Sequence, residues 1–482
     1  MAAIDSQASH AGLAEEPGQQ KDSNVILVGQ VLAILVPIAI WFSPIPIEPQ
    51  TKHAFAIVGF MVICWITQCI DYALAGFIGC FLFWVLQIAR FPVAWSGFAN
   101  DTPWFLFGAF LIGAVATRSG IARRIAYTVM LRIGITYPRI LLGLIVTDFL
   151  LTFLVPSGIA RIVIMAAIAL GLVEAFGAAR GSNVARGMFL ILTYTANIFD
   201  KMIIAGAGSI TARGFIEKDG GVEVLYSQWF LAFLPCSIIT LIAAWLLTLW
   251  LYPPETVRLE GGYAFLQKEL RKMGPLTPQE RKAALLIAAA ILLWLTDFLH
   301  HISASAIGIG VGLFALLPYV GILPIEELRR VNYGPVFFTA AAVSMGNVME
   351  QTKAIEVLTQ GIFAWIEPLL GNIVITTAVM YWAAFLYHFL LASEISMLGT
   401  SIPVVMQLAK ANGMNPLQLG LIWTFAAGGK LFAYQSGVLI VGYSYGYFEA
   451  RDLVRMGAWL TIVEFVVLML LVPFWWPLIG IH

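Results

Sequence analysis

The chain has few charged residues. Only 11% of its 482 residues are Asp, Glu, Lys or Arg, whereas soluble domains carry about 25%. The 27 basic and 27 acidic residues also cancel, so no basic excess exists to attract a phosphate backbone. The composition therefore excludes an ordinary soluble domain, and no nucleic-acid partner is expected.

Cysteines and enzyme motifs are scarce as well. The sequence contains no P-loop, no glycine-rich nucleotide fingerprint, no HExxH and no GxSxG. It is therefore expected to be no enzyme and to carry no cofactor. The four cysteines lie in apolar runs without the spacing of metal ligands, and we expect small buried side chains at Cys64, Cys69, Cys80 and Cys236.

Long apolar segments, in contrast, are abundant. Several approach or exceed the roughly 20 residues that a membrane-spanning helix needs, so we predict an all-α polytopic membrane protein in a lipid bilayer, with about 11 spans. The polar residues 1–24 lack the basic region of a signal peptide and are predicted to form a disordered cytoplasmic tail. The apolar segments include 25–45, 54–70, 72–89, 104–117, 227–252, 283–299, 304–320 and 456–478.

The distribution of Lys and Arg predicts the orientation. If the N-terminus is cytoplasmic, most basic residues outside the spans fall on the inner side, which agrees with the positive-inside rule. An odd number of crossings then leaves the C-terminus external. We expect a multi-pass protein of the cell inner membrane.

Two apolar stretches are interrupted by polar residues at matching places. The first contains Ser157 and Arg161, the second contains Ser393 and Glu394, and an offset of 236 residues places Ser157 on Ser393. Such residues are costly at membrane depth unless the backbone is buried in protein or lines a wet cavity. We predict re-entrant hairpins at 138–178 and 373–410.

Two further apolar stretches carry glycines in their middle and are predicted to be broken helices. They correspond at an offset of 231 residues, which places Gly206 on Gly437. The similar segments 98–126 and 331–359 have opposite charge bias, which an inverted repeat predicts. The predicted parts are a first half with scaffold spans (25–252, broken helix 185–212), a cytoplasmic linker with an interfacial helix (253–282) and a second half (283–482, broken helix 417–445).

Paired interruptions in two inverted halves are typical of the substrate site of a secondary transporter. Ends of broken helices present N–H dipoles to anions and free carbonyls to cations. Because three cations also lie within the membrane segments, namely Arg161, Lys201 and Lys430, we expect an anionic substrate. The alternative is internal ion pairing, for instance of Lys201 with Asp200 or of Arg161 with Glu394. Whether Lys201 and Lys430 face the site is left open.

Glu394 is a carboxylate at the predicted tip of the second hairpin. It either titrates with a proton during transport or forms a fixed ion pair with a core cation. A third alternative makes it an oxygen ligand of a coupling sodium ion. His388 and Asp148 lie one to two turns before the two tips and could extend a proton path.

Several of these segments resemble a known family. The most specific are TPWFLFGAFLIGAVATRSGIARRIA, the PSGIAR tip, YTANI and GYSYGYFEARDLVRMG. From about residue 30 to residue 478 the chain resembles the divalent-anion/sodium symporters, which are dicarboxylate, citrate and sulfate carriers. The resemblance implies a homodimer whose transport domain moves as an elevator against a scaffold domain. It also implies Ser-Asn-Thr at both tips, for substrate and sodium.

The two tips depart from that family pattern. They read Ser157, Gly158, Ile159 and Ser393, Glu394, Ile395, while Phe199 and Asp200 replace a Gly-Gly of the first broken helix. Both Asn amides and both Thr hydroxyls are missing, so we predict proton coupling or exchange rather than classical sodium coupling. The second hypothesis is a sodium-coupled symporter of a dicarboxylate or inorganic anion, with Glu394 as cation ligand. A membrane enzyme or a channel is a remote alternative.

The sequence thus predicts a secondary active transporter of a small organic anion that works by alternating access. Arg161 and Lys430 would neutralise the substrate, and serines and backbone at the interruptions would orient it. The predicted coupling-ion residues, for Na+ or H+, are Ser157, Asp200, Ser393 and Glu394. The predicted substrate-binding residues are Ser157, Gly158, Ile159, Arg161, Asn197, Gly206, Ser393, Glu394, Ile395, Lys430, Ser436 and Gly437.

Overall fold

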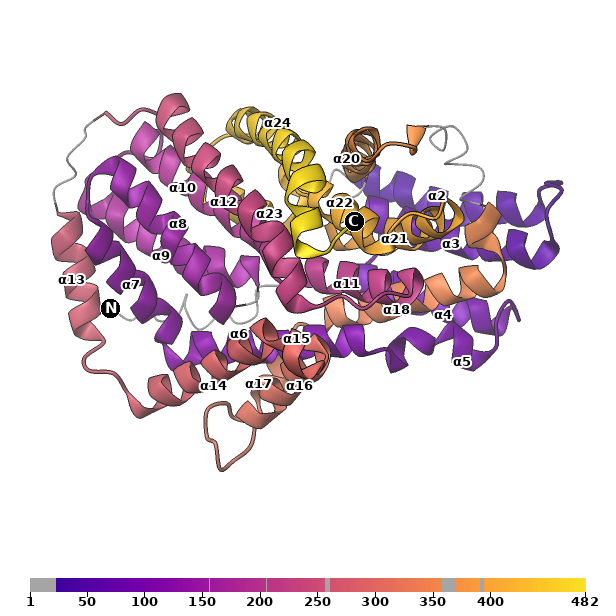
Figure 1. The fold of residues 1–482 in the computed structure, drawn as a ribbon, viewed down its shortest axis with the longest axis horizontal. Helices are drawn as coiled ribbons and strands as arrows, with labels where there is room; N and C mark the ends of the chain where they lie inside the picture. Colours follow the sequence, from indigo (N-terminus) through magenta and orange to yellow (C-terminus); the bar gives the residue numbers. More distant parts are fainter. Residues whose placement is uncertain (1–22, 156, 205, 256–260, 358–368, 391–393) are drawn as a thin grey trace.

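The apolar runs form helices throughout the chain (Figure 1). The structure is a computed structural model that describes residues 23–155, 157–204, 206–255, 261–357, 369–390 and 394–482. Across these ranges the regular elements are all helical and no strand is present. Of the predicted tail 1–24, all but Ser23 and Asn24, which begin α2, lies outside the described residues.

The first helices pack together at one end of the bundle (Figure 1). Helix α2 contacts α3, and α3 contacts α4. Gln68 ends α3 in the left-handed conformation (φ 51°), and the Asp71 side chain accepts the backbone N–H of Leu74 at 2.9 Å to begin α4. These elements are α2 (Ser23–Phe42), α3 (Pro49–Thr67), α4 (Tyr72–Val85), α5 (Phe91–Ala94) and the short 3-10 helix η2 (Ser96–Ala99).

Helices α6 (Asp101–Ser119) and α18 (Tyr333–Gln351) begin with the same cap. The side chain of Asn100 accepts the N–H of Thr102 at 3.0 Å, and that of Asn332 accepts the N–H of Gly334 at 3.1 Å. These caps lie in the two segments whose sequences resemble each other. After Gly120, α6 turns by 64° into α7 (Ile121–Ile133).

The four predicted interruptions coincide with helix ends. The first predicted hairpin contains α8 (Tyr137–Leu154) and α9 (Gly158–Ala175), and the second contains α20 (Ile373–Leu390) and α21 (Glu394–Ala411). The first predicted broken helix consists of α10 (Asn183–Met202) and α11 (Ala207–Gly220). The second consists of α22 (Pro416–Ala426), the 3-10 turn η4 (Ala433–Gln435) and α23 (Gly437–Ser444).

The remaining helices include the predicted linker and the last apolar run. Within the linker, α13 buries only Gly262 and Leu266, as a helix lying on a surface would. The long helices α12 and α24 contact each other. The elements are α12 (Tyr226–Leu251), α13 (Gly262–Lys272), α14 (Pro278–Leu295), α15 (Asp297–His300), α16 (Ala304–Ala315), α17 (Glu327–Arg330), α24 (Ala450–Phe474) and η5 (Trp476–Ile479).

Six helices in the described ranges are long and apolar enough to cross a membrane, and the bent pair α6–α7 makes seven. Shorter apolar helices such as α16, α20 and α22 add to these. Two of them, α20 and α22, belong to the interrupted segments, where a single helix need not span the whole bilayer. The structure therefore agrees with a polytopic membrane protein, and the number of about 11 spans stays a prediction. All four cysteines are buried and free, as expected.

Helix α14 is joined to α7 by an ion pair near the predicted inner surface, in which the Glu280 carboxylate is buried and Arg124 is partly exposed. Glu280 accepts hydrogen bonds from Arg124 Nε at 2.7 Å and Nη2 at 3.0 Å, and from the backbone N–H of Thr277 at 2.7 Å. Burial acts to raise the pKa of Glu280, but the hydrogen bonds from Arg124 and Thr277 outweigh it and hold the pKa below its usual value.

We expect Glu280→Gln to lower the free energy of unfolding by about 1–3 kcal/mol, because it weakens the buried acceptor of Arg124. A carboxylate with a lowered folded-state pKa stabilises the protein above its unfolded-state pKa, and this contribution is lost as the pH falls through the folded-state pKa. In thermal unfolding in detergent, Glu280→Gln should therefore unfold at a lower temperature than the wild type at pH 7, and the difference should disappear in acid. Glu326→Gln, at an exposed position, is the control. Equal effects of both variants would contradict this account.

Candidate functional site

The interruptions of the two halves lie against one another. A Cβ placed on Gly437, at the start of α23, would lie 2.9 Å from Cδ1 of Ile159 in α9. A Cβ on Gly208, in the first turn of α11, would lie 3.3 Å from the carboxyl carbon of Glu394. Each predicted hairpin tip thus contacts the broken helix of the opposite half. The N-termini of α9, α11, α21 and α23 all occur at these interruptions, and the first N–H groups of a helix have no partner within the helix and carry a partial positive charge.

Two carboxylates and two backbone carbonyls surround the guanidinium of Arg161. Its Nε donates to Asp148 at 3.0 Å and its Nη2 to Asp200 at 2.9 Å. Nη1 donates to the carbonyl of Val155 at 3.2 Å, and Nη2 also donates to that of Ala196 at 2.8 Å. The residue is 1% exposed. Arg161 therefore ties α8 and α9 to the C-terminal part of α10, and its partners are the two aspartates rather than Glu394.

Lys430 lies in the unwound segment between α22 and η4 and pairs with the predicted second tip. Its Nζ donates to Oδ1 of Asn197 at 2.5 Å and to a carboxylate oxygen of Glu394. The Lys430 side chain is fully buried, whereas that of Glu394 remains 13% exposed. The structure thus brings three predicted residues together, and Glu394 is the most accessible of them.

Lys201 has a different partner from the one considered from the sequence. Its Nζ lies 3.8 Å from the carboxylate of Glu464 on α24 and 5.4 Å from the ring centroid of Phe425, and it is not paired with Asp200. A Cβ on Gly428 would overlap this Nζ, at 1.3 Å, so the glycine makes room for the lysine. Lys201 is therefore paired with Glu464 on α24.

Two residues of this region were missed by the sequence analysis. Glu464 is the one acidic residue of the apolar run 456–478, and a lone carboxylate in a spanning segment is a signal that could have found it. The side-chain oxygen of Gln435 accepts the backbone N–H groups of Leu431 and Phe432 at 2.7 and 2.9 Å. The backbone carbonyl oxygen of Gln435 lies 3.2 Å from Nε2 of His388. Gln435 thereby satisfies part of the unwound backbone.

The other predicted residues occupy the same region with less specific contacts. Ser157 begins α9 by accepting the backbone N–H of Ala160 at 3.3 Å. Ser209, which was not among the predicted residues, lies next to Gly208 and donates to the carbonyl of Asp200 at 2.5 Å. Gly158, Gly206 and Ser436 are buried, Ile395 is partly buried, Ile159 is exposed, and Ser393 lies outside the described residues.

The site carries more negative than positive side chains. Three cations, Arg161, Lys201 and Lys430, face four carboxylates, those of Asp148, Asp200, Glu394 and Glu464. Among the described residues, Oδ2 of Asp148 and Oε2 of Glu464 are buried and have no hydrogen-bond partner. If every group is ionised, one net negative charge remains in the middle of an apolar bundle.

Interrupted helices that meet around buried charges inside an apolar bundle define a membrane transporter. The chain belongs to the family described as the sodium:sulfate symporter transmembrane region, whose model matches residues 24–482.

The chain is similar over nearly its whole length to several named transporters. It is 26% identical to the citrate/succinate antiporter of Escherichia coli (strain K12), over 94% of this chain and 98% of that protein. It is 24% identical to the putative malate transporter YflS of Bacillus subtilis (strain 168), over 97% and 100%. It is 23% identical to the L-tartrate/succinate antiporter of Escherichia coli (strain K12), over 93% and 97%. These relatives are transporters and not enzymes, which confirms the expectation from the missing enzyme motifs.

Proposed function

We propose that this protein is a secondary active transporter of a small organic anion of the di- or tricarboxylate type. It works by alternating access, as an exchanger or with a proton, and does not require sodium. The observation that carries the proposal is the buried Lys430–Glu394 pair at the second interruption. The relatives named as citrate, succinate, tartrate and malate carriers support the substrate class.

The side chains of Arg161 and Lys430 bind oxygen atoms that could otherwise be ligands of a coupling sodium ion. Hard cations such as sodium bind carboxylate, carbonyl and amide oxygens. At the first interruption such oxygens come from Val155, Ala196 and Asp200, and all bind Arg161. At the second, Asn197 and Glu394 bind Lys430. Since each cation belongs to the chain, its charge stays in the site throughout the transport cycle.

The proposed place of the anion is beside Lys430. Glu394 is the more accessible member of the pair, so an incoming carboxylate can compete with it for the ammonium group. Arg161 would keep its sequence-predicted role as a second positive charge near the substrate, although its hydrogen bonds in this structure go to protein acceptors. The remaining predicted ligands are Ser157, Gly158, Ile159, Asn197, Gly206, Ser393, Ile395, Ser436 and Gly437.

The charge of the site favours proton uptake with the substrate. Three cations against four carboxylates already leave one negative charge, and a dicarboxylate adds two more. An uncompensated charge in a low-dielectric interior is costly. Protonation of Glu394 would release Lys430 and reduce the negative charge in one step. Either a proton accompanies the anion, or one anion leaves as another enters.

The wider architecture is part of the proposal. We propose an inverted repeat with a scaffold and an elevator-type transport domain, assembled as a homodimer in the inner membrane, with the N-terminus cytoplasmic and the C-terminus external. The matching caps at Asn100 and Asn332 and the packing of each tip on the opposite half support the repeat. The Lys and Arg distribution supports the orientation.

We expect purified protein in liposomes loaded with succinate to take up labelled succinate, malate, citrate or tartrate saturably, while sulfate is taken up poorly. Empty liposomes without protein give the background. Uptake that rises linearly with concentration would indicate a channel. Preference for sulfate over every carboxylate would contradict the proposed substrate class.

The second candidate function is a sodium-coupled symporter with Glu394 and Asp200 as cation ligands. The excess of carboxylates over cations in the site and the sodium in the family description favour it. In that case sodium would replace the proton as the compensating charge.

A further inference from the structure

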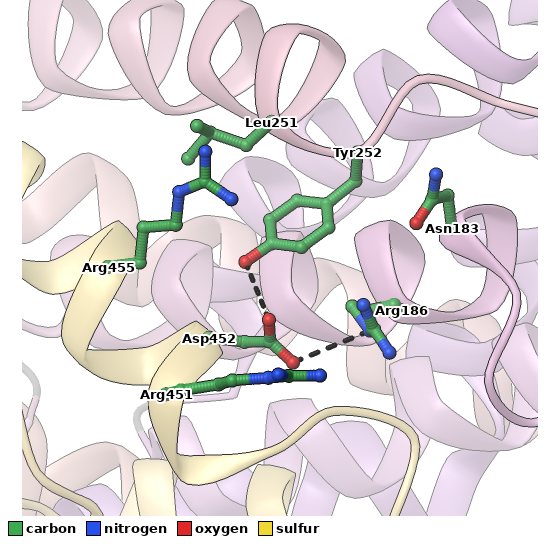
Figure 2. Close-up of a pocket in the computed structure, with 7 residues that line it drawn as sticks. All are labelled: Asn183, Arg186, Leu251, Tyr252, Arg451, Asp452 and Arg455. Carbon is green, nitrogen blue, oxygen red and sulfur yellow. Dashed lines mark hydrogen bonds and ion pairs between the residues drawn. The ribbon is translucent and has the colours of Figure 1, made fainter.

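A basic cavity of about 270 Å³ lies outside the transport site, where α10 and α24 begin and α12 ends (Figure 2). Three arginines line it: Arg186 from α10, and Arg451 and Arg455 from α24. Tyr252 and Asp452 complete its polar wall. Neither the family match nor the proposed transport mechanism assigns a role to this cavity.

Both oxygens of the Asp452 carboxylate bind groups of the protein itself. The carboxylate accepts a hydrogen bond from the hydroxyl of Tyr252 at 3.0 Å and lies 3.4 Å from Nε of Arg186 (Figure 2). It also accepts the backbone N–H of Glu449 at 2.9 Å. Its negative charge is therefore balanced by Arg186, and its oxygens do not face a ligand alone.

The remaining positive charge comes from Arg455. Arg451 pairs with Glu449 at 2.9 Å, whereas Arg455 is exposed and makes no hydrogen bond or ion pair with any described residue. Figure 2 shows its guanidinium beside Leu251 and Tyr252 at the cavity wall. Glu255, whose carboxylate accepts the backbone N–H groups of Asn183 and Val184 beside the cavity, also lies near Arg186. The cavity thus offers arginine N–H donors, and the guanidinium that the described residues leave unpaired is that of Arg455.

Two apolar stripes run away from the cavity along α12 and α24. Ile242, Leu246 and Trp250 recur every fourth residue on α12 and are all exposed. Trp459, Ile462 and Val466 form the matching exposed stripe on α24. The rings of Trp250 and Trp459 contact each other, with centroids 6.2 Å apart. Tryptophan is enriched where a spanning helix meets the membrane–water interface, so the cavity lies at headgroup depth and the stripes at acyl-chain depth.

We propose that this cavity binds the headgroup phosphate of an anionic phospholipid, with the acyl chains along the α12 and α24 stripes. The unpaired guanidinium of Arg455 can pair with the phosphodiester, and the two stripes can contact acyl chains, which a free dicarboxylate or inorganic phosphate lacks. Basic pockets between spanning helices bind anionic headgroups in this way. In the proposed orientation the lipid comes from the cytoplasmic leaflet. The site is separate from the proposed substrate site.

The test is the binding of phosphatidylglycerol to the purified full-length protein, measured by native mass spectrometry in a neutral detergent. Phosphatidylcholine with the same chains, inorganic phosphate and succinate are the comparison ligands. We expect phosphatidylglycerol to bind, and Arg455→Ala to weaken it about fivefold, since one basic side chain contributes that much at an anionic surface. Arg455→Lys should retain most of the binding. Arg329→Ala, at an exposed arginine of α17, should leave it unchanged.

Trp250→Ala separates the lipid from a free anion, because only the lipid uses the stripe. The Trp250→Ala variant should therefore bind phosphatidylglycerol more weakly than the wild type. Any one of four results would overturn the proposal: no binding of phosphatidylglycerol, equal binding of phosphatidylcholine, equal losses in Arg455→Ala and Arg329→Ala, or displacement of the lipid by inorganic phosphate or succinate. Thermal unfolding of each variant shows that it is folded, and if Arg455→Ala is not, Arg455→Gln replaces it.

Discussion

Replacing Lys430 with alanine should lower the rate of anion uptake by at least about a hundredfold. Removal of one member of a buried ion pair costs about 3–5 kcal/mol, and here the lost member is the cation that pairs with the accessible carboxylate of Glu394. In Lys430→Ala the site would hold four carboxylates and two cations, so an incoming anion would meet a strongly negative cavity. Uptake of labelled substrate into proteoliposomes measures the effect.

Two further variants show whether the loss comes from the site or from the fold. Lys410→Ala removes an exposed lysine at the far end of α21 and should transport normally. The double variant Lys430→Ala with Glu394→Gln removes both charges of the pair and should regain thermal stability without regaining uptake. Normal uptake by Lys430→Ala would show that this lysine has no part in anion binding.

Arg161→Ala should destabilise the protein by about 3–5 kcal/mol, because it leaves the buried carboxylates of Asp148 and Asp200 without their shared cation. Arg161→Lys should rescue it only in part, since a lysine cannot reproduce the fork that reaches four acceptors. Thermal unfolding in detergent measures both. Arg329→Ala, at an exposed position, should have little effect.

The Arg161 variants also test its sequence-predicted role as a substrate ligand. Adding Asp148→Asn to Arg161→Ala removes one of the two orphaned charges and should restore part of the stability. A stable Arg161→Ala protein that fails to bind anion would contradict the structural role described above and would place the guanidinium on the substrate. A substitution that destabilises the fold but leaves uptake per folded molecule unchanged would limit Arg161 to a structural role and would contradict its proposed role as a second positive charge near the substrate.

The helix interruptions could be predicted because they depend on local chemistry. Ser157, Gly158, Gly206 and Gly437 stand in apolar runs, where they mark an unwound or capped backbone, and the helices end at these places. Lys430 and Glu394 could be singled out because charges are rare at membrane depth. These signals depend only on neighbouring residues, so a single sequence carries them.

The ion-pair partners could not be predicted in the same way. Arg161 pairs with Asp148, 13 residues before it, and with Asp200, 39 residues after it. Lys201 pairs with Glu464 on the last long helix. Which carboxylate meets which cation depends on how α8, α10 and α24 pack together, and neither spacing nor periodicity contains that information. The adjacent Asp200 was therefore a reasonable but wrong partner for Lys201.

The central claim is that Lys430 and Arg161 replace coupling sodium, and it is tested most directly by exchange in sodium-free buffer. Proteoliposomes loaded with unlabelled succinate are placed in labelled succinate with choline or with sodium as the only cation, with and without a pH gradient. We predict equal exchange in choline and in sodium, and in Glu394→Gln exchange that persists but no longer responds to the pH gradient. A steep sodium dependence that disappears in Glu394→Gln would contradict the account and establish Glu394 as a sodium ligand.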